Sequence, residues 1–323
     1  MTRVTLTFCF ALLVFAPLLR AEPLDRRQLP AATTWFIHVD VEAASASMLG
    51  RGARGFLLSL PEARKAIEKA REALGIDITS DIRGITLYGV SYAPDRGVLI
   101  VRGKVDRSRL ETMLQKMAGY RTETVDGRSL YFWTERDQPR RVNAEPSSRT
   151  QAGAFSGDDG VVVANDAQAV VAALDVLDGK AASLPADSPL VVSSPSGTVI
   201  CSAAVGIAQA KTLPIQSPIL RQCESGSLAL GEHDGDAFFH ARVLTQSTQT
   251  AAQIRASVEG LRAMVELQAT ENAVAARLLQ PLKVTTDDKS VDVDWNFPSA
   301  ELVKMVTTWI ASHEAQAPPG GKQ

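Results

Sequence analysis

The chain has 323 residues, of which 45% are hydrophobic and 22% are charged, and its formal net charge is -2. This balance excludes the clustered basic charge with which nucleic-acid-binding proteins displace counterions. It also excludes a disordered chain, and the length is sufficient for two hydrophobic cores of about 150 residues each.

The first 21 residues have the layout of a secretory signal peptide. Arg3 precedes an apolar run from Val4 to Leu19, and the small residue Ala21 precedes the polar sequence EPLDRRQ. The run is shorter than the roughly 20 residues that span a bilayer. We therefore expect cleavage near Ala21, a periplasmic or secreted mature protein, and no membrane span after cleavage. An uncleaved membrane anchor is the alternative.

After a polar linker at 22–31, the first expected strand begins near Trp35. The side chains of Trp35, Ile37 and Val39 alternate with more polar ones, which is the period-2 pattern of a strand. We expect these apolar side chains to face the core. The intervening His38 and Asp40 are then expected on the solvent side.

Helices and hairpins follow in a regular succession. Pro61 opens a helix that is expected to end at Gly75, because proline suits the first helical turn and glycine the position after the last. The other elements are expected as a hairpin at 85–105, a helix after Ser108, strands at 120–125 and 128–135, a solvated loop at 136–150, a helix at 167–177, a linker at 180–197, a hairpin at 227–243, a helix around 254–265 and a hairpin from 281.

The same order of patterns occurs twice. GAFSGDDGVVVANDAQAVVAALDV (153–176) and PLKVTTDDKSVDVDWNFPSAELVKMV (281–306) each predict two strands around an Asp-Asp turn, followed by a capped amphipathic helix. The expected fold is therefore α+β, with two related repeats, each an antiparallel sheet with helices packed on one face. The expected boundaries are repeat 1 at 32–179, a linker at 180–197, repeat 2 at 198–313 and a disordered tail at 314–323.

Several segments resemble a family of exported bacterial proteins of unknown function. They are the signal segment, TTWFIHVDVEAASAS (33–47), GITLYG (84–89), GAFSGDDGVVVAND (153–166) and AALDVLDGK (172–180). The resemblance extends over most of the mature chain. It implies a periplasmic or cell-surface setting and supplies no catalytic residues.

Two cysteines, Cys201 and Cys223, remain after removal of the signal peptide. In an oxidising compartment a lone pair of cysteines is a disulfide candidate. Two buried free thiols are the alternative, because the separation of the Cα atoms cannot be read from the sequence.

His38 and Asp40 are the candidate catalytic residues. Residues i and i+2 of a strand share a face, about 6 to 7 Å apart, so Asp40 could orient His38 as a general base. The nucleophile motifs G-x-S-x-G, S-x-x-K and C-x-x-C are absent from the sequence, and Ser156 in GAFSGDDG belongs to an alternating strand. A polar strand face is the alternative interpretation.

His233 and Asp236 are the candidate metal ligands. A two-residue turn at Asp234-Gly235 would place them opposite each other, but two ligands are fewer than the four of a structural zinc site. Asp292 and Asp294 alternate with valines, which indicates a polar strand face rather than a calcium site.

GRGARG (50–55) fits the dinucleotide pattern G-x-G-x-x-G, but the spacing from the preceding strand is wrong, and a flexible basic loop is expected there. No cofactor is expected. The sequence thus favours an exported, non-catalytic module that binds a protein or small ligand in the cell envelope, with an exported hydrolase using His38 and Asp40 as the alternative.

Overall fold

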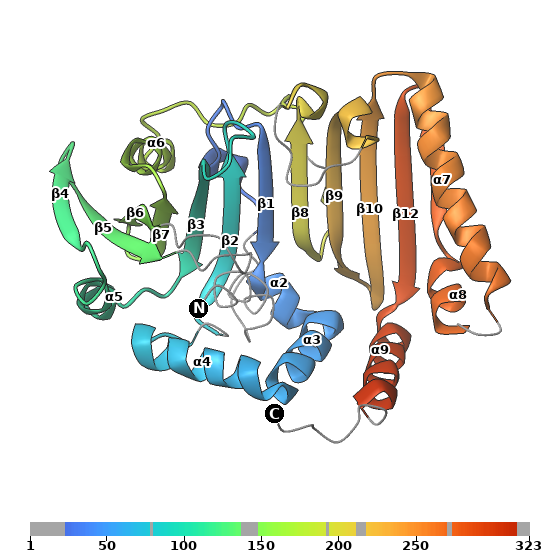
Figure 1. Cartoon of the computed structure of the whole chain (residues 1–323), viewed down its shortest axis with the longest axis horizontal. Helices are drawn as coiled ribbons and strands as arrows, with labels where there is room; N and C mark the ends of the chain where they lie inside the picture. The colour runs from blue at the N-terminus through green and yellow to red at the C-terminus, as the bar shows by residue number, and fades with distance from the viewer. Residues whose placement is uncertain are drawn as a thin grey trace.

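Twelve strands form one sheet that is antiparallel throughout (Figure 1). The computed structural model describes residues 23–77, 80–136, 148–191, 194–210, 218–269 and 273–314. Within these ranges the strand order is β11-β12-β10-β9-β8-β1-β2-β3-β7-β6-β5-β4. The expected signal peptide, most of the loop expected at 136–150 and almost the whole of the expected tail lie outside the described residues.

The first half of the molecule, residues 35–177, supplies seven of these strands and five helices. The strands are β1 (Trp35–Asp40), β2 (Ile82–Gly89), β3 (Gly97–Gly103), β4 (Arg121–Val125), β5 (Arg128–Arg136), β6 (Ser148–Ser156) and β7 (Gly160–Ala164). The helices are α2 (Val41–Ala46), α3 (Met48–Ser59), α4 (Pro61–Leu74), α5 (Arg107–Leu114) and α6 (Ala167–Leu177), and a short 3-10 turn, η1 (Arg26–Gln28), precedes them.

The second half, residues 198–314, supplies the remaining elements. They are β8 (Thr198–Val205), η2 (Ile207–Gln209), η3 (Leu220–Gln222), β9 (Cys223–His233), β10 (Asp236–Thr245), α7 (Thr248–Leu267), α8 (Ala273–Leu279), β11 (Lys283–Asp287), β12 (Ser290–Pro298) and α9 (Ser299–Glu314). Strand β8 pairs with β1 over five residue pairs, from Trp35 with Ala204 to Val39 with Ile200. The α+β class is confirmed, but the two expected sheets are one continuous sheet.

Tight turns with positive φ angles set the register of the hairpins. Asp234 and Gly235 have φ angles of 50° and 86°, the left-handed conformation that a two-residue hairpin turn requires. His233 consequently lies opposite Asp236, as the sequence predicts.

The helix boundaries follow local signals in some places and tertiary contacts in others. Helix α4 begins at Pro61 and ends before Gly75, whose φ is 68°, as predicted. The expected loop at GRGARG is wrong, because residues 50–55 lie inside α3. Ser47 caps this helix by accepting a hydrogen bond from the Gly50 amide, a signal that the sequence contains.

The two faces of the sheet are named here after neighbouring residues of β1: the His38 face and the Ile37 face. The expected orientation of β1 is wrong, since His38 is only 4% exposed whereas Ile37 is 44% exposed. The main core lies on the His38 face, where Val170 and Leu174 of α6 pack with Phe36, Tyr88 and Ile100 of the central strands.

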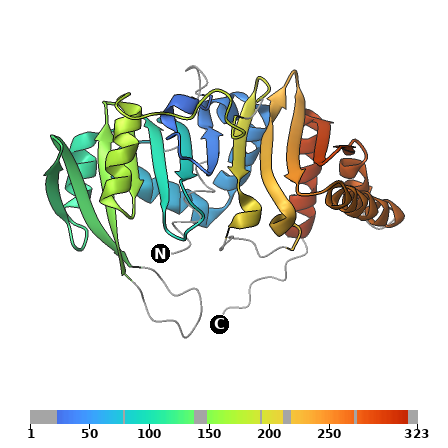
Figure 2. The ribbon, with the colours of Figure 1, turned by 90° about the horizontal axis from the view of Figure 1, so that it is seen from above.

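Helices also lie on the Ile37 face, as the view from above shows (Figure 2). Ile67 of α4 packs with Val39, Ile85 and Val101, and Ile254 of α7 packs with Val243 of β10. The expectation that all helices pack on one face is therefore wrong. Among the described residues, every helix is too short or too polar to cross a membrane.

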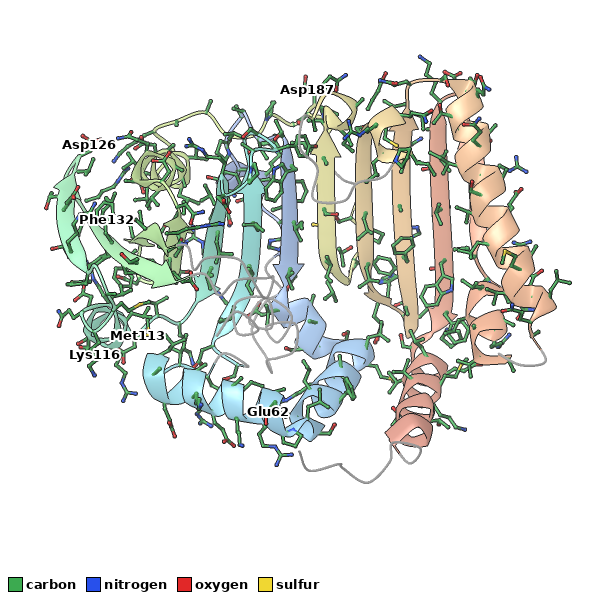
Figure 3. All side chains as sticks on the ribbon, in the orientation of Figure 1. Glu62, Met113, Lys116, Asp126, Phe132 and Asp187 are labelled. Atoms are coloured by element: carbon green, nitrogen blue, oxygen red, sulfur yellow. The ribbon has the colours of Figure 1, made fainter. Side chains whose placement is uncertain are left out.

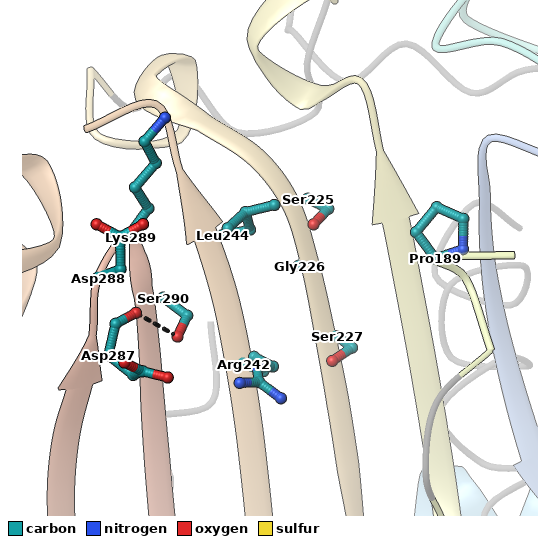
Figure 4. A pocket seen from close by; sticks show the side chains of 10 residues that line it. All are labelled: Pro189, Ser225, Gly226, Ser227, Arg242, Leu244, Asp287, Asp288, Lys289 and Ser290. Atoms are coloured by element: carbon teal, nitrogen blue, oxygen red, sulfur yellow. Dashed lines mark hydrogen bonds between the residues drawn. The ribbon is translucent and has the colours of Figure 1, made fainter. Parts of the chain in front are cut away.

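The His38 face differs between the two halves: α6 covers it in the first half, whereas in the second half it combines the buried Phe238 with the more exposed His240 and Arg242 of β10. Helix α6 packs on β3, β6 and β7, whereas α9, which also follows a hairpin, lies beside α3 at one end of the sheet (Figure 1). Figure 3 draws the side chains of the sheet, and those of β9, β10 and β12 include polar groups. They include Ser227, Arg242 and Ser290, which line a shallow pocket (Figure 4).

Candidate functional site

The two predicted catalytic candidates lie at the centre of the sheet, where the two halves meet. Strand β1 has β2 on one side and β8 on the other, so His38 lies between Thr86 and Cys201 in register. Side chains directly opposite each other have Cβ atoms about 4.5–5.5 Å apart. A row of three polar or thiol side chains therefore crosses the middle of the covered face.

A cavity of about 430 Å³ opens beside this row. It is formed by the end of β1, by helix α2, by the segment before β8 and by the end of β9, so that both halves contribute to its wall. Its lining residues are Pro23, Leu24, His38, Asp40, Ala43, Ala46, Ser47, Ser194, Pro195, Ser196, Gly197, Thr198, Cys201 and Glu232.

His38 and Asp40 are held by interactions that also stabilise the fold. His38 Nδ1 and Thr86 Oγ1 share a hydrogen bond of 2.8 Å, and all of this contact is buried. Asp40 Oδ1 accepts a 2.7 Å hydrogen bond from the Ala43 amide and thereby caps the N-terminus of α2. The positions of both side chains are thus fixed within the protein.

The thiol of Cys201 is kept in its protonated form by its surroundings. Burial raises its pKa to about 11, a hydrogen bond with Ser194 lowers it in part, and the negative charge of Asp40 raises it further. A cysteine nucleophile reacts as the thiolate. At neutral pH, Cys201 is therefore a neutral polar contact on the cavity wall.

Glu232 brings the second half to the rim of the cavity. Its two carboxylate oxygens accept hydrogen bonds from the amides of Met48 and Leu49, at 2.9 and 3.0 Å. These amides belong to the first turn of α3, which attracts negative charge because its N–H groups lack partners within the helix. The carboxylate of Glu232 thus occupies the N-terminus of α3. A dinucleotide phosphate would have to bind at this same helix end if GRGARG were a dinucleotide-binding loop.

The geometry of the row bears on the hydrolase alternative. The register places His38 beside the thiol of Cys201 and the hydroxyl of Thr86. At neutral pH the thiol is protonated, Nδ1 of His38 is hydrogen-bonded to Thr86, and an oxygen of Asp40 caps α2.

The predicted metal candidates lie at an exposed hairpin tip, away from the cavity. His233 Nε2 is 3.3 Å from the carboxylate of its neighbour Asp234, and both side chains are largely exposed. His233 and Asp236 are opposite in register. Within the part of the chain that the structure describes, three or more His, Cys, Asp or Glu residues do not gather at any point in a metal-binding arrangement.

The acidic side chains of β12 lie on the open part of the His38 face. Asp294 is 2.5 Å from Nδ1 of His240, and Asp292 is 3.3 Å from the guanidinium of Arg242. This confirms the prediction of a polar strand face. The sequence alone does not predict the pairing of His240 with Asp294, because this pairing depends on the register between β10 and β12.

The expected disulfide is not formed in the structure, where Cys201 and Cys223 are both free and buried. Cys201 lies opposite Ala229, and Cys223 is six positions earlier on the same strand as Ala229. At about 3.4 Å per residue this is roughly 20 Å. A disulfide requires Cα atoms within about 7 Å of each other.

The sequence matches no known protein family and no curated protein. Among solved structures, crystal form III of TP0453 aligns with 90% of this chain and 100% of its own, with a TM-score of 0.46 and 8% identity. Crystal form IV of TP0453 aligns with 89% of this chain and 97% of its own, with a TM-score of 0.43 and 9% identity.

Sequence patterns identified part of the cavity wall. His38 and Asp40 form an i, i+2 pair that the sequence shows directly. Thr86, Cys201 and Glu232 lie on strands that are far from β1 in the sequence. Their common location depends on the pairing of β1 with β2 and β8 and on the capping of α3. One sequence pattern that indicates the location of Cys201 is the alternation of residues in β8. It places Cys201 and Ala203 on the same face, which is buried.

Proposed function

We propose that this protein is an exported, non-catalytic binding module of the cell envelope that holds a small ligand in the cavity between its two halves. The observation that carries the proposal is the cavity itself. Its volume of about 430 Å³ falls within the range of roughly 300–1,000 Å³ of small-molecule sites. Buried polar groups from both halves converge on it. Export is inferred from the signal-peptide pattern of residues 1–21.

The proposal includes a duplicated origin for the sheet. Outward from its centre, the strand order is β1-β2-β3-β7-β6 in one direction and β8-β9-β10-β12-β11 in the other. The third strand leads to α5 in one half and to α7 in the other, and the final hairpin leads to α6 and α9. We infer two related repeats, close to 32–179 and 198–313, with the hairpin of β4 and β5 as an insertion.

Ligands often bind where two structural units meet, because neither unit covers its own boundary. In this protein the boundary carries a histidine, a carboxylate and a thiol that are held in place by hydrogen bonds. Such preorganised groups lower the entropy cost of binding. This supports a receptor for a small molecule more strongly than an enzyme.

The test is to identify what the cavity contains in the cell. Ala46 lines the cavity and is exposed, so Ala46→Trp should fill it without disturbing the core. Ala300→Trp is the matched control, because Ala300 is exposed on α9 and lies outside the cavity lining. The three proteins would be purified natively from the envelope fraction, denatured, and their released small molecules identified by mass spectrometry.

We expect the same compound from the wild type and from Ala300→Trp, and none from Ala46→Trp. Equal recovery from Ala46→Trp would place the ligand elsewhere. The hydrolase alternative is tested with His38→Gln, whose amide can still bond to Thr86. Wild-type turnover of ester, peptide or glycoside substrates that is lost in His38→Gln, at an unchanged melting temperature, would favour an enzyme.

A further inference from the structure

Strand β4 is the last strand of the sheet on the side of the first half (Figure 1). Among the described residues, no strand lies beside its outer edge. Its first four residues, 121–124, are all exposed. The opposite edge strand, β11, differs because α7 packs against it. The outer edge of β4 can therefore accept a further strand, since unpaired backbone groups of an edge strand are a template for pairing.

The turn after β4 determines which of its backbone groups are directed outward. Asp126 and Gly127 form a two-residue turn with φ angles of 50° and 75°, directly after Val125. The residues that flank such a turn are hydrogen-bonded to each other, and hydrogen-bonded and non-hydrogen-bonded positions alternate along an antiparallel pair. Val125 therefore directs its N–H and C=O groups to β5. The alternation directs those of Thr124 and Thr122 away from β5, toward the outer edge.

Two opposite charges lie on one face of β4. Nε of Arg121 is 2.8 Å from Oε1 of Glu123, and both side chains are half-exposed. The guanidinium carbon of Arg121 also lies 3.9 Å from the centre of the buried Phe132 ring. These contacts hold Arg121 in place beside the edge. A partner strand thus meets one cation and one anion, two residues apart.

A second copy of β4 fits this edge in one antiparallel register. When Thr122 lies opposite Thr122 of the second copy, Arg121 of each copy lies opposite Glu123 of the other. The outward-directed residues then also meet each other, as backbone hydrogen bonding requires. A shift to the next such register would place Glu123 opposite Glu123, or Arg121 opposite Arg121. Like charges directly opposite each other are destabilising, so the charges select the register at Thr122.

A groove beside β4 can receive the tyrosine of the second copy. In the selected register, Tyr120 of the second copy lies opposite Thr124, with Cβ atoms about 4.5–5.5 Å apart. Thr124 lines a cavity of about 290 Å³, and the wall of this cavity includes Glu111 and the hydroxyl of Tyr131. The Tyr131 hydroxyl donates a hydrogen bond to Glu111. An aromatic ring with a polar tip suits this position, because one end meets the strand and the other meets the polar wall.

We propose that β4 is a dimerisation edge, at which two copies of this chain pair their β4 strands antiparallel about a two-fold axis at Thr122. The sheets of the two copies then become one continuous sheet. A two-fold contact uses the same surface on both copies and closes on itself, so it produces a dimer and not a filament. This interface is separate from the cavity between the two halves, and it does not depend on what that cavity binds.

Sedimentation of the protein without residues 1–21 would measure the association, at concentrations up to roughly 1 mM. We expect a monomer–dimer equilibrium for the wild type. Thr122→Pro removes an outward N–H group and no hydrogen bond to β5, so it should give a folded monomer. A wild type that stays monomeric over the whole range would overturn the proposal and leave this edge to a strand of another protein.

Charge reversals test the register. Glu123→Arg places cations opposite each other, and Arg121→Glu does the same with anions, so each variant alone should dimerise roughly 10-fold more weakly. An equimolar mixture of the two variants restores two Arg–Glu pairs and should associate as the wild type does. Lys283→Glu is the matched control, because Lys283 is exposed on the opposite edge strand, β11. It should leave the association unchanged. Melting temperatures would confirm that each variant is folded.

Cross-linking locates the contact directly. Cys201 and Cys223 are buried, so a short bismaleimide would react with a cysteine introduced on the surface. Thr122→Cys should give a covalent dimer, because the Cα atoms of a hydrogen-bonded pair are about 5.5 Å apart. Thr285→Cys, at an exposed position of β11, should not. Equal cross-linking of the two variants, no cross-linking of Thr122→Cys, or a mixture of charge variants that stays monomeric would each overturn the proposed pairing.

Discussion

The His38 face has different roles in the two halves of the sheet. In the first half α6 covers it with buried valines and leucines, whereas in the second half α9 lies beside α3 and the same face carries polar side chains beside the buried Phe238. The two helices follow hairpins of similar sequence pattern, yet they lie in different places. Similar local patterns can therefore end in different tertiary packing, because the position of a helix depends on which surface offers it apolar contacts.

The largest expected effect concerns the two histidines on this face. His38→Ala should lower the free energy of unfolding by about 2–4 kcal/mol, because it leaves a void and a buried Thr86 hydroxyl without its partner. His240→Ala should cost at most about 1 kcal/mol, since it removes a partly exposed hydrogen bond with Asp294. Urea denaturation of both variants would measure this. Similar losses would contradict the contrast between a buried and a partly exposed histidine on this face.

The pH dependence of stability tests whether water is excluded from the Cys201 thiol at the centre of the sheet. Because the folded-state pKa of Cys201 is about 11, the unfolded chain ionises this thiol at lower pH than the folded protein does. Stability should therefore be intact below about pH 9 and should decrease by roughly 2–3 kcal/mol between pH 9 and 11. Cys201→Ala should remove that part of the decrease. An identical alkaline profile for the variant would indicate a hydrated thiol.

A matched pair of valine truncations compares the two helices directly. Val170→Ala in α6 removes two methyl groups from a fully buried site and should cost about 1–3 kcal/mol. Val306 in α9 is 45% exposed, so Val306→Ala should change stability by no more than about 0.5 kcal/mol. Thermal and urea melts would measure both. A large loss at Val306 would mean that α9 packs as closely as α6.

The smallest effect tests the contact of α9 with α3. Gly55→Ala should stabilise the protein by about 0.5–1 kcal/mol, because alanine favours the helix and nothing lies within 4 Å of the added carbon. At Gly52 the added carbon would lie 3.1 Å from Val303 of α9, so Gly52→Ala should gain less or lose stability. An equal gain at both positions would argue against this contact.

Local signals in the sequence were sufficient for several elements. Pro61 and Gly75 marked the ends of α4, and Asp234-Gly235 marked a turn with the correct register. The glycines of GRGARG favour a loop, but Ser47 supplies a helix cap and the structure places these residues in α3. Its three glycines weaken helix propensity, and the contacts with α9 and the cap from Glu232 compensate for this.

The candidate site was less predictable, because it depends on pairing between distant strands. The period-2 pattern of β1 separates Ile37 from His38 but does not say which of them is buried. Hydrophobicity favoured Ile37, and the structure instead buries His38 with Thr86 as its partner. The same limitation explains why the sequence suggests a disulfide that the structure lacks. The number of residues between Cys201 and Cys223 carries no information about where they lie along β8 and β9.

The pairing of β1 with β8 has a consequence for synthesis of the chain. Strand β1 is among the first segments to emerge, and the residues that complete its second edge, such as Ala204 opposite Trp35, follow more than 160 positions later. Until then, a nascent β1 presents an unpaired edge that can join other chains. A ribosome adds about 5–20 residues per second, so this exposure lasts for roughly ten to thirty seconds. We therefore expect each newly made molecule to pass through an aggregation-prone interval, during which a holding chaperone would shield the edge of β1.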